Sequence, residues 1–130
     1  MTKQTVEAQG VSVPAAPYSQ ALTVEARRTL HISGQVPVDQ AGNLIGLGDV
    51  EAQAAKVFDN IRSICEAAGG SLDSLVFLRI YLTDMGFRPA ITKIRNELLK
   101  PPYPAATMVQ VSALADENWL VEIEAEAALD

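Results

Sequence analysis

The sequence predicts an α+β fold in which two helices cover one face of a β-sheet. In two segments, 50–68 and 88–100, apolar residues recur at steps of three and four, which is the spacing of one helical face. In several other segments they recur at every second position, as in strands with one buried face. The predicted order is β-β-α-β-α-β-β, and two helices are enough to cover only one face of such a sheet.

The N-terminal part is expected to hold an arm, a hairpin and a loop. Residues 1–17 are polar and contain two prolines, so we expect an extended arm. The β-like runs 19–25 and 29–35 are joined by the charged string EARR, a pattern that predicts a β-hairpin. Residues 36–49 carry three glycines and an asparagine, which favour turns, and are expected to form a loop.

The first predicted helix, 50–68, has suitable capping residues at both ends. Asp49 can accept hydrogen bonds from the free amides of the first turn, and Gly69 or Gly70 can adopt the left-handed conformation that ends a helix. Cys65 lies on the apolar face, where a thiol is expected to be an inert part of the core. The residues of this face are Val50, Ala54, Val57, Ile61, Ile64, Cys65 and Ala68.

The central strand, 75–83, carries apolar residues on both of its faces. One face holds Val76, Leu78, Ile80 and Leu82. The other face holds Leu75, Phe77, Arg79, Tyr81 and Thr83. Because two helices cover only one face, Leu75, Phe77 and Tyr81 would form an exposed apolar patch unless another chain covered them. The sequence therefore predicts an obligate homo-oligomer.

The second helix and two further strands complete the predicted fold. Pro89 suits the first turn of the helix 88–100, and two prolines directly after it end the helix. One face of this helix is formed by Ile91, Ile94, Leu98 and, in part, Arg95. Residues 105–114 and 119–129 have the alternation of strands, and the last strand carries three glutamates on one face.

Length and composition favour a single-domain protein and disfavour a membrane protein, a nucleic-acid-binding protein and a metalloprotein. A chain of 130 residues can bury one core, so we expect a single domain over 1–130. It has one cysteine, no signal-peptide pattern and no long apolar run, and we expect a cytoplasmic protein without a membrane partner. The net charge of −6, with scattered Lys and Arg, disfavours binding of nucleic acid. His31 has no companion at metal-ligand spacing, so no metal site is expected.

Four strings, taken together, resemble one family. They are APYSQAL, HISGQVPVD, NIRSICEAAGGSLDSLVFLRIYLTD and YPAATMVQV with VEIEAEA, and they lie between Pro14 and Ala127. On these strings the chain resembles the Rid family, also called YjgF or reactive intermediate deaminase. The resemblance implies a chorismate-mutase-like fold with a mixed sheet and a homotrimer with ligand clefts between subunits. It also implies hydrolysis of enamines or imines to a carbonyl compound and ammonia, without a metal or organic cofactor.

Three positions of the implied cleft depart from the family pattern. The arginine that holds the substrate carboxylate belongs in a PAR string, and here the string is PAA, with Ala106 at that position. Met108 stands where a cysteine is frequent, and Thr92 lies near the position of an asparagine. A guanidinium fork matches two carboxylate oxygens, so its loss beside Glu122 implies a net negative pocket that disfavours free carboxylates. Arg79 could supply the missing cation, although an interface ion pair is the alternative.

Other positions match the family and are candidate ligand contacts. Tyr18 corresponds to the family tyrosine, and Ser33, Gly34 and Gln35 correspond to its SGQ bend. Glu122 is the candidate catalytic acid, which could orient or protonate the water that attacks an imine carbon. Backbone amides near Gly34 could polarise a ligand oxygen. The alternative for Glu122 is a solvent-facing strand position, because two further glutamates follow on the same face.

Three functions are consistent with these observations. The first is a homotrimer that binds a small metabolite in inter-subunit clefts and hydrolyses an enamine or imine. The second is a non-catalytic, small-molecule-binding or regulatory protein that retains the fold. The third is an endoribonuclease or translation inhibitor, an activity sometimes attached to this family, against which the acidic composition argues.

Overall fold

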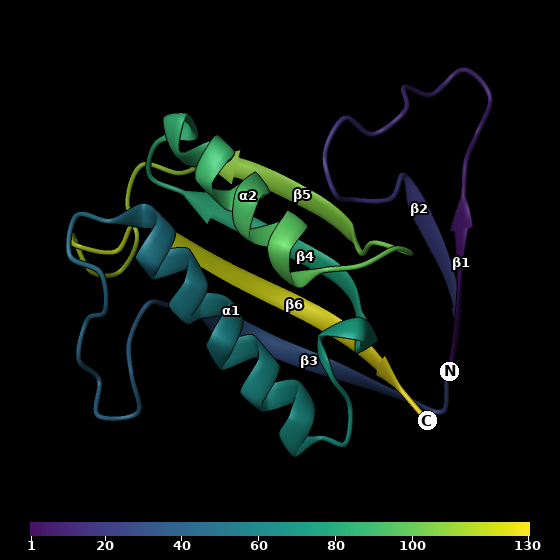
Figure 1. Cartoon of the computed structure of the whole chain (residues 1–130), viewed down its shortest axis with the longest axis horizontal. Coiled ribbons are helices and arrows are strands. Elements are labelled where there is room, and N and C mark those ends of the chain that lie inside the picture. The colour runs from purple at the N-terminus through teal and green to yellow at the C-terminus, as the bar shows by residue number, and fades with distance from the viewer.

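A computed structural model describes all 130 residues and has two helices packed on one face of a four-stranded sheet (Figure 1). The strand order is β3-β6-β4-β5. The pair β4–β5 is parallel and the other neighbours are antiparallel, so the predicted mixed α+β architecture is confirmed. The elements are β1 (Thr2–Val6), β2 (Ala21–Glu25), β3 (Arg28–Gln35), α1 (Val50–Ala67), β4 (Leu75–Leu82), α2 (Arg88–Leu98), β5 (Ala105–Gln110) and β6 (Val121–Leu129), with 3-10 turns at Leu72–Ser74 and Met85–Phe87.

The predicted hairpin between 19–25 and 29–35 is wrong. β2 pairs with β1 in a separate two-stranded ribbon, whereas β3 pairs with β6 (Figure 1). The reason lies at the two ends of β2. The Ser19 amide donates to the Pro104 carbonyl before β5 (3.1 Å), and the Arg27 amide donates to the Leu129 carbonyl at the end of β6 (3.1 Å). The chain therefore crosses the end of the sheet, and part of the predicted arm becomes β1.

α1 forms where the sequence predicts it. The Asp49 carboxylate accepts a hydrogen bond from the Ala52 amide (3.1 Å), and Gly69 has a φ of +92° after the last turn. The carboxylate satisfies a free amide of the first turn, and the left-handed glycine lets the chain leave the helix at its C-terminal end. Cys65 is fully buried, as expected, and burial raises the pKa of its thiol, which keeps it protonated.

β4 differs from the prediction at its first two residues: Leu75 belongs to the core, whereas Val76, predicted on the same face as Leu78, is half-buried and lies outside the core. A register shift between Leu75 and Phe77 turns Leu75 into the core, where it is fully buried.

The helix-free face of the sheet instead carries charged side chains next to the half-buried rings of Phe77 and Tyr81. Arg79 stacks on Phe77, with its guanidinium carbon 4.4 Å from the ring centroid, and its Nη1 lies 3.6 Å from Glu126 Oε1. No helix in the structure has the length and hydropathy needed to cross a bilayer.

Candidate functional site

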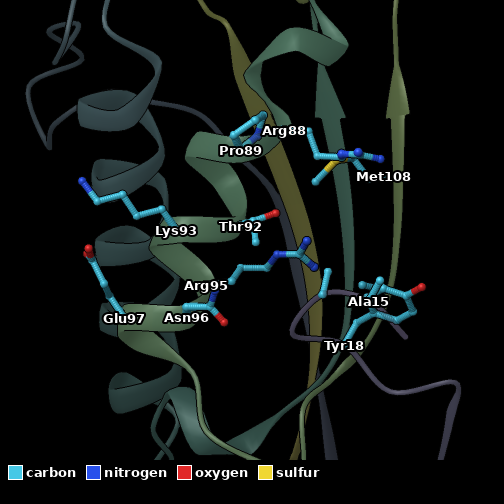
Figure 2. A pocket seen from close by; sticks show the side chains of 12 residues that line it. Ala15, Tyr18, Arg88, Pro89, Thr92, Lys93, Arg95, Asn96, Glu97 and Met108 are labelled. Atoms are coloured by element: carbon cyan, nitrogen blue, oxygen red, sulfur yellow. The ribbon is translucent and has the colours of Figure 1, made fainter. Parts of the chain in front are cut away.

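A cavity of about 870 Å³ lies between α2, β5 and the segment that precedes β2 (Figure 2). Its volume is in the range of small-molecule sites. β5 contributes the side chains of Ala106 and Met108, one small and one flexible. These residues pair with the buried Leu78 and Ile80 of β4, so they lie on the face of the sheet that carries α2. The lining residues are Ala15, Ala16, Tyr18, Arg88, Pro89, Thr92, Lys93, Arg95, Asn96, Glu97, Ala106 and Met108.

Local hydrogen bonds hold the N-terminal wall of the cavity in place. The Ser19 hydroxyl donates to the Tyr103 carbonyl (2.6 Å), and the Tyr18 amide donates to the Ala16 carbonyl (2.7 Å). Pro17 is buried, which fixes the chain between these contacts. Tyr18 is thereby placed opposite α2, on the far side of the cavity (Figure 2).

Arg95 is the buried cation of this cavity. Arg95 is only 4% exposed, and its side chain extends from α2 toward Tyr18 and Met108 (Figure 2). Nε is buried without a hydrogen-bond partner, and none of the ion pairs in the chain includes this residue. Burial lowers the pKa of the guanidinium, while Tyr18 acts in the opposite direction. Arginine nonetheless stays protonated in proteins, so the cavity contains a positive charge that nothing in the chain neutralises.

The other charged groups of the lining are arranged differently. Lys93 and Glu97 project from the opposite side of α2, toward α1 (Figure 2). Lys93 Nζ lies 2.6 Å from Glu51 Oε1, and this hydrogen bond raises the pKa of the lysine. Arg88 lies at the same end of the cavity as Met108 (Figure 2). The lining thus carries three cations and one carboxylate. The expectation of a net negative pocket is wrong, because it considered only the loss at Ala106.

The structure brings together one half of the predicted site residues. Tyr18, Thr92, Ala106 and Met108 line the cavity, although they come from three separate segments. Sequence reasoning did not select Arg95 as a ligand contact. The available signal was a single cation on the apolar face of helix 88–100. The side chain of Arg79, the cation that was considered, lies on the opposite face of the sheet beside Glu126.

The other predicted residues form a second group on the helix-free face. Glu122 is paired with Tyr81, between the fully buried Val121 and Ile123, so its side chain points away from the helices. Gly34 lies against it: a Cβ at this glycine would be 2.0 Å from Glu122 Oε2. The glycine is thus required for close approach. None of these residues lines the cavity of its own chain.

The SGQ bend itself is irregular. The register of β3 on β6 shifts between Ile32 and Gln35, and the side-chain Nε2 of Gln35 donates to the Ser33 carbonyl (3.1 Å). Such bulges are frequent beside functional sites, where they redirect side chains. Ser33, Gly34, Gln35 and Glu122 therefore make a compact group, but one that is separated from the cavity by the sheet. No group of three or more His, Cys, Asp or Glu side chains is placed to hold a metal ion.

Comparisons with known proteins agree with this fold. A family model described as Endoribonuclease L-PSP matches residues 10–129. A RutC family protein from Sulfurisphaera tokodaii is 38% identical over 120 residues, covering 92% of this chain and 94% of that protein. A protein named 3-aminoacrylate deaminase RutC, from Acinetobacter baylyi, is 34% identical over 127 residues, covering 98% of each chain.

A solved structure is also closely similar. It is YyfB, a Yersinia pestis protein of unknown function in the conserved Rid family. It superposes with a TM-score of 0.88 at 31% identity, covering 99% of this chain and 100% of the other. With the family model and relatives that span nearly the whole chain, the protein belongs to the Rid (YjgF) family.

Proposed function

We propose that the protein is a homotrimer that binds a small metabolite in the α2–β5 cavity and hydrolyses an enamine or imine to a carbonyl compound and ammonia. The observation that carries this proposal is the convergence of Tyr18, Thr92, Ala106 and Met108 on one cavity. These are positions that the family resemblance assigns to the ligand cleft. The cavity also combines an apolar wall, which includes Ala15, Ala106 and Met108, with polar side chains from α2 that could orient a ligand.

The chemistry needs no redox partner. The relative from A. baylyi is named for 3-aminoacrylate, which is an enamine that carries a carboxylate. In its imine tautomer, water adds to the carbon of the C=N bond, the C–N bond then breaks, and the products are a carbonyl compound and ammonia. The protein has to place one water and move protons between it and the nitrogen. A carboxylate such as Glu122 can do this as a general acid and base.

The placement of Glu122 supports a site shared between copies of the chain. Within one chain, Glu122 and Gly34 lie on the helix-free face of the sheet, whereas the cavity lies on the helical side. A site that uses both groups needs the helix-free face of a second copy at the mouth of the first copy's cavity. Closed cyclic assembly then repeats this contact, which gives three equivalent sites in a trimer.

Ammonia release tests the proposed reaction. An amino-acid oxidase generates the imine in situ, and the protein is expected to accelerate ammonia release over buffer. Glu122→Gln should lower kcat by about a hundredfold, a typical contribution of one positioned acid or base. Glu66→Gln, an exposed change on α1, is the matched control and should retain activity. Equal rates with and without protein would refute the deaminase proposal.

Light scattering tests the assembly separately. A trimer of the 13.9 kDa chain has a mass of about 42 kDa. A monomer at micromolar concentration would contradict the shared site. If ligand binding is present but ammonia release is not, the protein is instead a non-catalytic binder, an alternative favoured by Ala106 at the position of the family arginine. The net charge of −6 disfavours an endoribonuclease role.

A further inference from the structure

We propose that Arg95 is the anion anchor of the cavity and that the ligand carries a carboxylate, which the Arg95 guanidinium binds from α2. This inference rests on the proposed function only in taking the cavity as the ligand site. It assigns the anchoring role to a helix residue, whereas the family resemblance places the corresponding cation on β5, at the position of Ala106.

The first argument is the unsatisfied state of Arg95. The residue is 4% exposed, Nε has no acceptor, and no carboxylate of the chain forms an ion pair with it. The acid that lines the same cavity, Glu97, projects from the other side of α2 (Figure 2). Buried charges in proteins are normally paired and hydrogen-bonded. A missing counterion next to an open cavity therefore points to an anion that enters the cavity.

The second argument is the shape and chemistry of the site. A guanidinium presents its two terminal nitrogens as a planar fork, which matches the two oxygens of a carboxylate. The side chain extends into the cavity toward Tyr18 and Met108 (Figure 2), so the fork is accessible to a ligand there. Ala15, Pro89 and Ala106 provide apolar wall for the remainder of a small acid. The geometry therefore favours a short monocarboxylate with an apolar tail.

A third observation explains why α2 can place a cation here. Arg88, Thr92 and Arg95 recur at steps of four and three, so the three side chains lie along one side of α2. Thr92 adds a hydroxyl between the two guanidinium groups. Because Ala106 carries only a methyl group, β5 leaves space in the cavity for a side chain from the opposite wall. The sequence change on the strand and the buried arginine on the helix are thus parts of one arrangement.

Titration with a matched acid and amide tests the anchor without requiring turnover. The probes are 2-oxobutanoate and 2-oxobutanamide, which have the same size but differ in charge. Calorimetric titration of the wild type is expected to show at least about tenfold tighter binding of the acid. Arg95→Gln should weaken binding of the acid by about thirtyfold, a typical effect of losing a charge-assisted pair, and leave binding of the amide unchanged. Arg95→Lys should retain only part of the affinity for the acid, because an ammonium group lacks the planar fork of the guanidinium.

Lys100→Gln is the matched control, since it removes one positive charge directly after the same helix, from an exposed side chain that does not line the cavity. It should change the affinity for the acid by less than about twofold. The proposal is overturned if the acid and the amide bind equally, if 2-oxobutanoate fails to bind at up to about 10 mM, or if Arg95→Gln binds the acid as the wild type does.

Two further measurements distinguish the ligand anchor from a subunit contact made by Arg95 and from the proposed deaminase reaction. If Arg95→Gln converts a trimeric wild type into monomers, its anion is a carboxylate of a second copy, and the ligand anchor is refuted. If the acid binds through Arg95 but no ammonia is released, the anchor stands and the deaminase proposal fails. The reverse result, ammonia release that is insensitive to Arg95→Gln, supports the reaction and refutes the anchor.

Discussion

Removing the buried charge of Arg95 should stabilise the ligand-free protein. In Arg95→Met, a flexible apolar side chain replaces a cation that has no counterion and is 4% exposed. Replacing even a paired buried ion by apolar residues of similar volume is often neutral or stabilising by about 1–4 kcal/mol, and Arg95 has no pairing interaction to lose. Only Nε is both fully buried and without a partner, so the terminal nitrogens retain some hydration. We therefore expect the lower half of that range, about 1–2 kcal/mol.

The order should reverse when the acid is present. For a chain of this length, about 1–2 kcal/mol corresponds to a rise in Tm of roughly 3–10 °C for the variant without ligand. At a 2-oxobutanoate concentration of about 100 times Kd, the wild type gains about 2.7 kcal/mol from binding, whereas the variant loses most of this gain. The wild type should then melt at the higher temperature.

Differential scanning calorimetry in low-salt buffer measures both effects. Protein concentrations have to be equal, because the Tm of an oligomer depends on concentration. Lys100→Met serves as the control: its side chain is exposed and lies outside the cavity, with Nζ 3.5 Å from Asp73 Oδ2, and its loss should leave the ligand-induced rise in Tm intact. The reasoning is refuted if Arg95→Met melts below the wild type without ligand, or if it keeps the full rise in Tm with 2-oxobutanoate.

Three further predictions concern the cavity, the SGQ bend and the pH dependence of stability. Adding Ala106→Arg to Arg95→Gln should recover at least about a tenth of the wild-type affinity for 2-oxobutanoate, because it returns the cation to the cavity from β5; calorimetric titration showing no recovery would contradict this. Gly34→Ala should lower kcat for ammonia release at least about tenfold with little change in Tm, since the new Cβ forces the Glu122 carboxylate to rotate; unchanged kinetics would show that this acid is not used. Burial lowers the pKa of Lys3, so between that lowered value and the ordinary value of 10.5 the unfolded chain binds more protons than the folded chain. The free energy of unfolding of the wild type should therefore rise with pH relative to that of Lys3→Met. Urea unfolding from about pH 9 to 10.5 measures this difference in free energy between wild type and variant, and a difference that falls with pH would contradict the prediction.

The helices and the core strands could be predicted because their signals are local. The face of α1 repeats at helical spacing, and both of its ends carry capping residues. In β6, Val121, Ile123 and Ala125 alternate with glutamates and are buried as expected. Each of these patterns depends only on neighbours within one element. Boundaries differ from the prediction by a few residues, as is usual at frayed or capped ends.

The errors concern features that depend on distant segments. β2 has the local pattern of a hairpin partner, but the contacts of Ser19 near β5 draw it across the end of the sheet and away from β3. Leu75 follows the alternation of its strand in sequence, yet the register shift against β6 turns it into the core. Neither contact leaves a signal in the segment itself, because pairing and register are decided by tertiary packing.

The electrostatics of the candidate site show why a motif position is an incomplete guide to function. The family resemblance implies a cation on β5 at the position of Ala106, and an inference from that motif alone predicts a pocket that disfavours acids. A long arginine on an apolar helix face could equally extend its charged end to solvent. Only the fold decides between these outcomes, because it places Arg95 across the cavity from the small residue of β5.

The origin of the cation also affects the reaction. In the proposed arrangement a carboxylate would be held from α2 rather than from β5, and this would displace the reacting carbon relative to an acid that a second copy supplies. Misplacement by about 1 Å can reduce rates by about a hundredfold. Under this proposal, we therefore expect affinity for small acids and hydrolysis of an enamine or imine to be separable in this chain. Strong binding of 2-oxobutanoate together with slow release of ammonia from its imine would mean that the natural substrate differs in the distance between its carboxylate and its nitrogen.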